Sequence, residues 1–170
     1  MGYRPAFWGA QGWGAPATWE QINSACEALA AAPDVNYALA LPSDPTQNYA
    51  HQVFEQIAMS NQAWPLAPDG SVTFTTPEMV ESLRFYSDLQ RCSAPAPLNV
   101  EQSANAYLRG EVAMLFYSTY IMDDLVEGAQ RADGSVVEPS VADLAQRTSF
   151  ASGMVGPRGS ASYGQVVALA

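Results

Sequence analysis

The stretch that decides the fold runs from residue 104 to residue 125 and reads Ala-Asn-Ala-Tyr-Leu-Arg-Gly-Glu-Val-Ala-Met-Leu-Phe-Tyr-Ser-Thr-Tyr-Ile-Met-Asp-Asp-Leu. It predicts a helix that ends at Gly110, a buried strand over Val112–Phe116, and a second helix that opens at residue 118 or 119. This order places Tyr117 and Tyr120 at the carboxyl end of a strand. Open α/β sheets bind their ligands at such ends, so we expect a ligand site here.

Outside this stretch, helix signals outnumber strand signals, and the short strands are separated by helices. Thr18 and Gln21 form a capping-box pattern that opens a helix ended by Pro33, and Thr76-Pro77-Glu78 opens another. Further helices are predicted near residues 49–60, 101–109 and 141–147, with strands at 35–41, 72–74 and 166–170. The pattern predicts one α/β domain over residues 1–170, with a small mixed sheet flanked by helices.

The composition excludes several classes of protein. The 170 residues carry a net charge of −10 and only seven positive side chains, all of them arginine, so no basic surface for nucleic acid can form. No apolar run reaches the roughly 20 residues of a transmembrane helix. The first residues lack the pattern of a signal peptide. We therefore expect either a cytoplasmic protein or a piece of a longer protein whose leader is missing.

The two cysteines show neither metal-ligand spacing nor a CxxC motif. Cys26 and Cys92 each fall on, or at the end of, a predicted helix. We expect two buried free thiols. A disulfide between them is the alternative, and it would suit an exported protein.

Motifs for catalysis, metals and phosphate are absent from the sequence. His51 is the only histidine, and no Gly-x-Ser-x-Gly motif accompanies it. The adjacent acids Asp123 and Asp124 point about 100° apart on a helix and are better explained as favourable charges in its first turn. We expect no metal and no cofactor, and we expect that the protein is not an enzyme.

A surplus of tyrosines lies in loops and at the ends of predicted elements. Each one alone is explained as a side chain at the edge of the core with its hydroxyl in water. Together they could stack on sugar rings, while nearby polar side chains bond to hydroxyl groups. The tyrosines are Tyr49, Tyr117, Tyr120 and Tyr163, and the polar neighbours are Gln47, Asn48, Ser118 and Gln165.

Four segments resemble the sugar-binding solute-binding proteins of bacterial ABC importers, the group that includes maltose-binding protein. They are residues 3–22 (YRPAFWGAQGWGAPATWEQI), 72–89 (VTFTTPEMVESLRFYSDL), the opening stretch, and 155–165 (VGPRGSASYGQ). All four segments occur in the order that the family has. Two features depart from the pattern: the polar segment 129–138, and Gln165, where the family often has glycine.

The resemblance implies one lobe of a type II periplasmic-binding-protein fold, in which two lobes close around a ligand. The chain would supply most of the second lobe, without the first lobe and the final helices. By the same resemblance, Trp19 packs within the lobe. The ligand-binding residues would be Tyr49, Tyr117, Ser118, Tyr120, Tyr163 and Gly164. A permease would be the partner of the full-length protein, which would be periplasmic, or extracellular and lipid-anchored.

Three functions therefore remain open. The first is binding of a carbohydrate or a related small polar solute for ABC import, by aromatic stacking and hydrogen bonds to hydroxyls. The second is a small α/β hydrolase that uses His51. The third is a truncated interaction module without a ligand. If the first function is correct, this chain forms only half of the cleft, and we expect it to bind its ligand weakly by itself.

Overall fold

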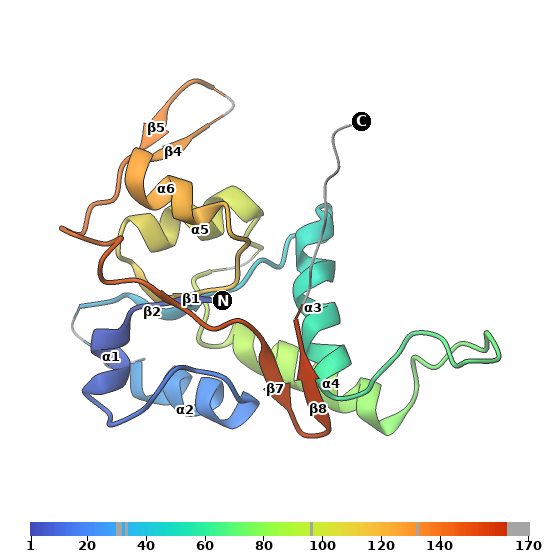
Figure 1. Cartoon of the computed structure of the whole chain (residues 1–170). Coiled ribbons are helices and arrows are strands. Elements are labelled where there is room, and N and C mark those ends of the chain that lie inside the picture. Colours follow the sequence, from blue (N-terminus) through green and yellow to red (C-terminus); the bar gives the residue numbers. More distant parts are fainter. Residues whose placement is uncertain (30–31, 33, 96, 132, 163–170) are drawn as a thin grey trace.

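A four-stranded mixed sheet organises the chain (Figure 1). The computed structural model describes residues 1–29, 32, 34–95, 97–131 and 133–162. The strands run in the order β2 (Tyr37–Ala40), β3 (Val112–Leu115), β1 (Gly2–Tyr3) and β6 (Ser149–Phe150). β2 and β3 are parallel, whereas β1 is antiparallel to both of its neighbours, β3 and β6.

In the described residues, six α-helices surround this sheet: α1 (Pro5–Gly9), α2 (Trp19–Leu29), α3 (Asn48–Ser60), α4 (Pro77–Gln90), α5 (Val100–Leu108) and α6 (Ile121–Glu127). The buried side chains fall into two main clusters. One cluster contains side chains from the helices α1, α2, α3 and α4, together with Leu39 and Met114 of the sheet. The other joins α5 and α6 with Ala40 and Leu115. Figure 1 shows the corresponding layers, with α1 and α2 below the central strands and α5 and α6 above them. The predicted α/β class is confirmed.

Local sequence signals explain where the helices begin. Thr18 and Gln21 form the predicted capping box, since each backbone N–H donates to the other side chain at 3.1 Å. The Thr76 hydroxyl accepts from the backbone N–H of Met79, and Pro77 follows as the first helical residue. These interactions satisfy backbone groups that a helix start leaves unpaired.

The part of the chain that the structure describes also contains two small hairpins. β4 (Ala129–Gln130) pairs with β5 (Val136–Val137), so the polar segment predicted over 129–138 is a hairpin. β7 (Met154–Gly156) pairs with β8 (Gly159–Ala161) and packs on α3 (Figure 1). Arg158, in the turn of the second hairpin, donates to Glu81 Oε2 at 2.6 Å and to Asn61 Oδ1 at 2.5 Å. This hairpin is thereby held against α3 and α4.

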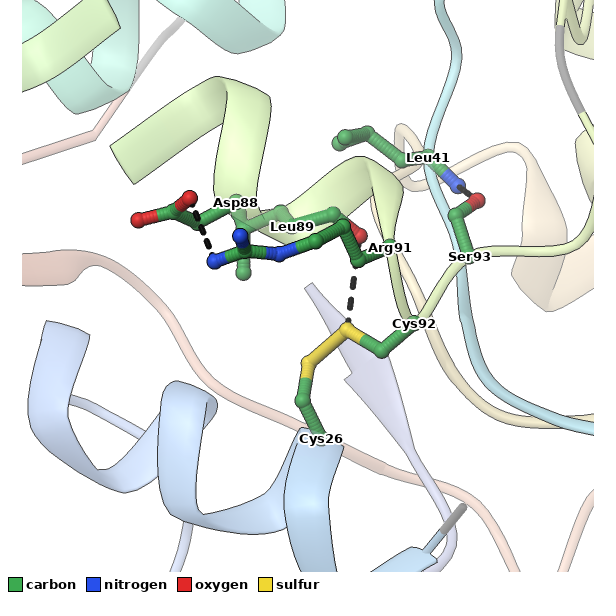
Figure 2. The surroundings of a disulfide bond; sticks show 7 residues. All are labelled: Cys26, Leu41, Asp88, Leu89, Arg91, Cys92 and Ser93. Atoms are coloured by element: carbon green, nitrogen blue, oxygen red, sulfur yellow. Dashed lines mark hydrogen bonds and ion pairs between the residues drawn. A yellow bond between two sulfur atoms is a disulfide. The ribbon is translucent and has the colours of Figure 1, made fainter. Parts of the chain in front are cut away.

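The expectation of two free thiols is wrong. Cys26 of α2 and Cys92, which follows α4, form a disulfide across 66 positions of sequence, with their Cα atoms 5.4 Å apart (Figure 2). Both helices pack on the same face of the sheet, and this packing brings the two cysteines together. The pairing is a property of the tertiary structure, which the spacing of the cysteines in the sequence does not reveal.

Two other local predictions differ from the structure. Residues 141–147 form turns rather than a helix, and Asp143 has a positive φ of 55°, which interrupts helical geometry. Residues 72–74 make only an isolated bridge, between Val72 and Leu66. The short helix α1 was not predicted from the sequence. The strand predicted at 166–170 lies outside the described residues.

Candidate ligand-binding site at the strand ends

The candidate site is placed by the two parallel strands at the centre of the sheet. Ala40 at the end of β2 lies opposite Leu115 at the end of β3. Phe116 continues the pairing, because its N–H donates to the Ala40 carbonyl at 3.3 Å. The two segments that follow these strands therefore start at the same edge of the sheet. One leads into α3, and the other leads through Tyr117 into α6.

Tyr49 and Tyr117 meet above this edge. Tyr49 lies in the first turn of α3, and its ring centroid is 5.7 Å from that of Tyr117, with the ring planes tilted by 41°. Both rings are half-buried and pack against the edges of the two core clusters. Such tilted contacts between aromatic rings are favourable and orient both rings. The structure therefore brings these two predicted site residues together.

Ser118 joins the pair through a hydrogen bond with Tyr49. Burial raises the pKa of Tyr49 to about 12, and the interaction with Ser118 acts in the opposite direction by favouring the phenolate. Burial also raises the pKa of Tyr117, and the carboxylate of Asp124 acts in the same sense. Both phenols are therefore neutral hydrogen-bonding groups at neutral pH.

Tyr120 occupies a different position at the same end of the sheet. It lies immediately before α6 and is 68% exposed, and its backbone N–H donates to the Ser118 hydroxyl oxygen at 3.3 Å. Ser118 thus contacts both Tyr49 and the backbone of Tyr120. An exposed ring beside a half-buried aromatic pair offers an apolar surface with polar groups at its margin, which is the usual composition of a ligand site.

The other predicted site residues differ in their outcome. Tyr163, Gly164 and Gln165 lie outside the described residues. The side-chain oxygen of Gln47 accepts from the N–H of Val100 at 3.0 Å, which ties the loop before α3 to the start of α5. The ligand-binding role of each tyrosine stays a prediction.

His51 lies exposed on α3 beside a carboxylate of the same helix. Its side chain is 70% exposed, and Nε2 lies 3.0 Å from Glu55 Oε1, one turn further along α3. Among the described residues, no group of three or more His, Cys, Asp or Glu side chains is arranged to hold a metal ion. In the same residues, no helix is long and apolar enough to cross a membrane.

Comparison with known proteins gives the family context. Over 123 residues, 32% are identical to an Escherichia coli (strain K12) protein named "Putative ABC transporter periplasmic-binding protein YcjN". The chain is homologous to the periplasmic-binding proteins of ABC transporters. The match covers 72% of this chain and 28% of the relative, so the chain corresponds to less than a third of that binding protein's length. No family model matches the sequence.

Solved structures place the fold among the same binding proteins. Maltose-bound MalE3 of T. maritima aligns with 93% of the chain at a TM-score of 0.72 and 19% identity. The GacH receptor of Streptomyces glaucescens aligns with 93% at 0.68 and 18% identity, and a solute-binding protein of Agrobacterium vitis aligns with 88% at 0.64 and 18% identity. The chain covers 38%, 37% and 34% of these proteins, respectively. It therefore has the fold of a type II periplasmic-binding-protein lobe.

Within this binding-protein lobe, Trp19 has the packing role that the resemblance implied. It is buried and stacks on Phe85 with ring centroids 4.2 Å apart and planes within 2°. Its indole N–H donates to the Ser60 hydroxyl at 3.0 Å. The stack joins α2 to α4, and the hydrogen bond joins both to the end of α3. Trp19 is thus committed to the core and is not available to a ligand.

Proposed function

We propose that this chain forms most of the second lobe of an ABC-importer binding protein and presents one wall of its solute-binding cleft. The ligand is a carbohydrate or a related small polar solute. The observation that carries the proposal is the convergence of Tyr49, Tyr117 and Ser118 at the strand ends, beside the exposed ring of Tyr120. The homology to a periplasmic-binding protein supports this assignment.

The chemistry of the site suits a polyhydroxylated ligand. An aromatic ring can cover the C–H face of a sugar, while phenol and serine hydroxyls donate to or accept from its hydroxyl groups. The group itself consists of phenols and a serine hydroxyl, which suit an uncharged ligand, and the charge of Arg131 acts on Tyr117 from outside the group. The solved relatives are consistent with this class, since one is bound to maltose, one to D-mannitol and one to acarbose.

A binding role also suits the rest of the chain. The relatives are named as binding proteins of transporters, which favours solute capture without chemical conversion. The disulfide between Cys26 and Cys92 is typical of proteins that fold in an oxidising compartment. We therefore propose a periplasmic or extracellular protein, lipid-anchored in its full-length form, that delivers its ligand to an ABC permease.

The test is an amide NMR titration of this chain with maltose and with D-mannitol. Because one wall supplies only part of the contacts, we expect saturation in the millimolar range, with shifts concentrated at residues 49 and 117–120. Replacing Tyr120 with alanine should weaken binding about fivefold, which corresponds to the loss of an aromatic contact worth about 1 kcal/mol. The Val126→Ala variant is the control, because Val126 is 75% exposed on α6, the helix that follows Tyr120.

Five outcomes would contradict the proposal. Micromolar affinity would mean that the chain forms a complete site rather than one wall. Shifts that avoid the tyrosines would place the site elsewhere. Equal weakening by Tyr120→Ala and Val126→Ala would remove the specific role of Tyr120. Hydrolysis of a test ester that disappears in a His51→Ala variant would support the hydrolase instead. Absence of binding to any sugar or polyol would favour the interaction module.

A further inference from the structure

A hollow lies at the opposite edge of the sheet from the tyrosines. Its volume is about 800 Å³, within the range of small-molecule sites. Arg4 directly follows β1 and reaches the amino-terminal end of β3, whereas Tyr117 follows the carboxyl-terminal end of β3. The side chains that matter for its chemistry are Arg4, Phe7, Leu29, Asp34, Val141 and Arg147.

Arg4 is fixed at this hollow by its surroundings. The residue is only 9% exposed, and Nη1 donates to the Gly110 carbonyl at 3.1 Å. The guanidinium carbon lies 4.5 Å from the centre of the Phe7 ring, a cation–π contact. These contacts hold the charged group in place and leave further guanidinium donors available to a ligand, because a guanidinium carries five N–H groups.

Neither arginine at the hollow has a carboxylate partner. All 17 acidic side chains of the sequence belong to the part of the chain that the structure describes, and none lies within 4.0 Å of Arg4 or Arg147. Burial lowers the pKa of Arg4, and the charge of Arg147 adds to this effect, while Asp34 opposes it. With two arginines and one aspartate, the hollow carries one net positive charge in a protein of net charge −10.

A buried guanidinium without a carboxylate in direct contact is costly, and a bound anion would reduce this cost. We propose that the hollow binds a small organic monocarboxylate with an apolar body. A planar carboxylate matches the fork of the guanidinium donors, and one negative charge balances the net charge of the lining. Phe7, Leu29 and Val141 would contact the apolar body. This site is separate from the tyrosine site and does not depend on the function proposed for it.

The probe is benzoate, with the neutral amide benzamide and inorganic phosphate as comparisons. We expect benzoate to bind saturably at millimolar concentrations, with amide NMR shifts at residues 4–7, 29, 34 and 141–147. Benzamide has the same ring without the charge and should bind at least tenfold more weakly. Phosphate has the charge without an apolar body and should also bind more weakly than benzoate.

Three variants test the residues. Arg147 is exposed, so Arg147→Gln should fold normally and weaken benzoate binding about tenfold, the effect of losing one charge-assisted hydrogen bond. Asp34→Asn removes the competing negative charge and should strengthen binding severalfold. Arg84→Gln removes an exposed arginine on α4 and is the matched control, for which no change is expected.

The proposal is overturned if benzamide binds as well as benzoate, because the charge would then have no role. It is also overturned if Arg147→Gln and Arg84→Gln behave alike, or if benzoate produces no shifts at these residues. In those cases Arg4 serves only to join β1 to the carbonyl of Gly110. Tighter binding of phosphate than of benzoate would contradict the assigned ligand class.

Discussion

The ring centroids of Tyr49 and Tyr117 lie 5.7 Å apart, although Tyr49 lies in the first turn of the helix after β2 and Tyr117 follows β3. Their contact depends on the parallel pairing of the two strands, which directs both loops to one edge. A double-mutant cycle should therefore detect it. We expect Tyr49→Ala and Tyr117→Ala to show a coupling of about 1 kcal/mol in the free energy of unfolding.

The measurement is chemical denaturation of the wild type, both single variants and the double variant. Tyr49→Ala combined with Val126→Ala is the control cycle, since Val126 is exposed on α6 and belongs to neither core cluster. The effects of these two substitutions on the free energy of unfolding should be additive. Additive effects of Tyr49 and Tyr117 would show that the ring contact contributes nothing to stability.

Alkaline pH should destabilise the protein through its buried tyrosines. Burial raises the pKa of Tyr49 and of Tyr107 to about 12, from an ordinary value of 10. The folded state thus retains two protons that the unfolded chain loses first, so stability is complete below pH 10 and falls as pH rises toward 12. Denaturation across this range should show the decrease, and Tyr49→Phe should make it less steep.

Absorbance of tyrosinate provides an independent measure. In the folded protein, part of the absorbance change should appear only near pH 12, and Tyr49→Phe should reduce that late part. Complete ionisation of all tyrosines near pH 10, while circular dichroism still reports the folded state, would contradict the assignment.

The disulfide should contribute substantially to stability. A crosslink across 66 positions restricts the unfolded chain by about 4 kcal/mol in the loop-entropy model. We expect a reductant to lower the free energy of unfolding by roughly this amount, measured by chemical denaturation. A variant with alanine at both Cys26 and Cys92 should be equally unstable and should not respond to the reductant. An unchanged denaturation midpoint in the reduced protein would contradict this prediction.

Substitution of Gly110 should lower the stability of the protein for two reasons, backbone strain and a steric clash. A matched variant at another glycine can separate the two. Its φ is +71°, and a Cβ at this position would clash with Cγ2 of Val141. Gly134 has a similar φ of +82° but no atom within 4 Å of the added Cβ. We expect Gly134→Ala to cost about 1 kcal/mol of stability through backbone strain alone, and Gly110→Ala to cost about 2–4 kcal/mol. Equal losses would show that Val141 moves away freely.

Local signals in the sequence were sufficient for much of the fold. Thr18 with Gln21, Thr76 with Pro77, and the apolar run from Val112 predict the starts of α2 and α4 and the strand β3, because caps and strand patterns act between residues close in sequence. The same signals failed at residues 141–147, where a positive φ at Asp143 replaces a helix by turns. Homology to binding proteins likewise agrees with the resemblance found in the sequence.

By itself, the sequence determined the α/β class, most helix boundaries and the position of Tyr117 and Tyr120 after β3. Only the tertiary structure decided which distant residues meet: Cys26 with Cys92, Tyr49 with Tyr117, and Arg4 with the hollow at the far edge of the sheet. The physical reason is that each of these contacts depends on how helices pack on the sheet and how strands pair. Packing and pairing are set by the whole core, whereas local sequence patterns specify only the individual elements.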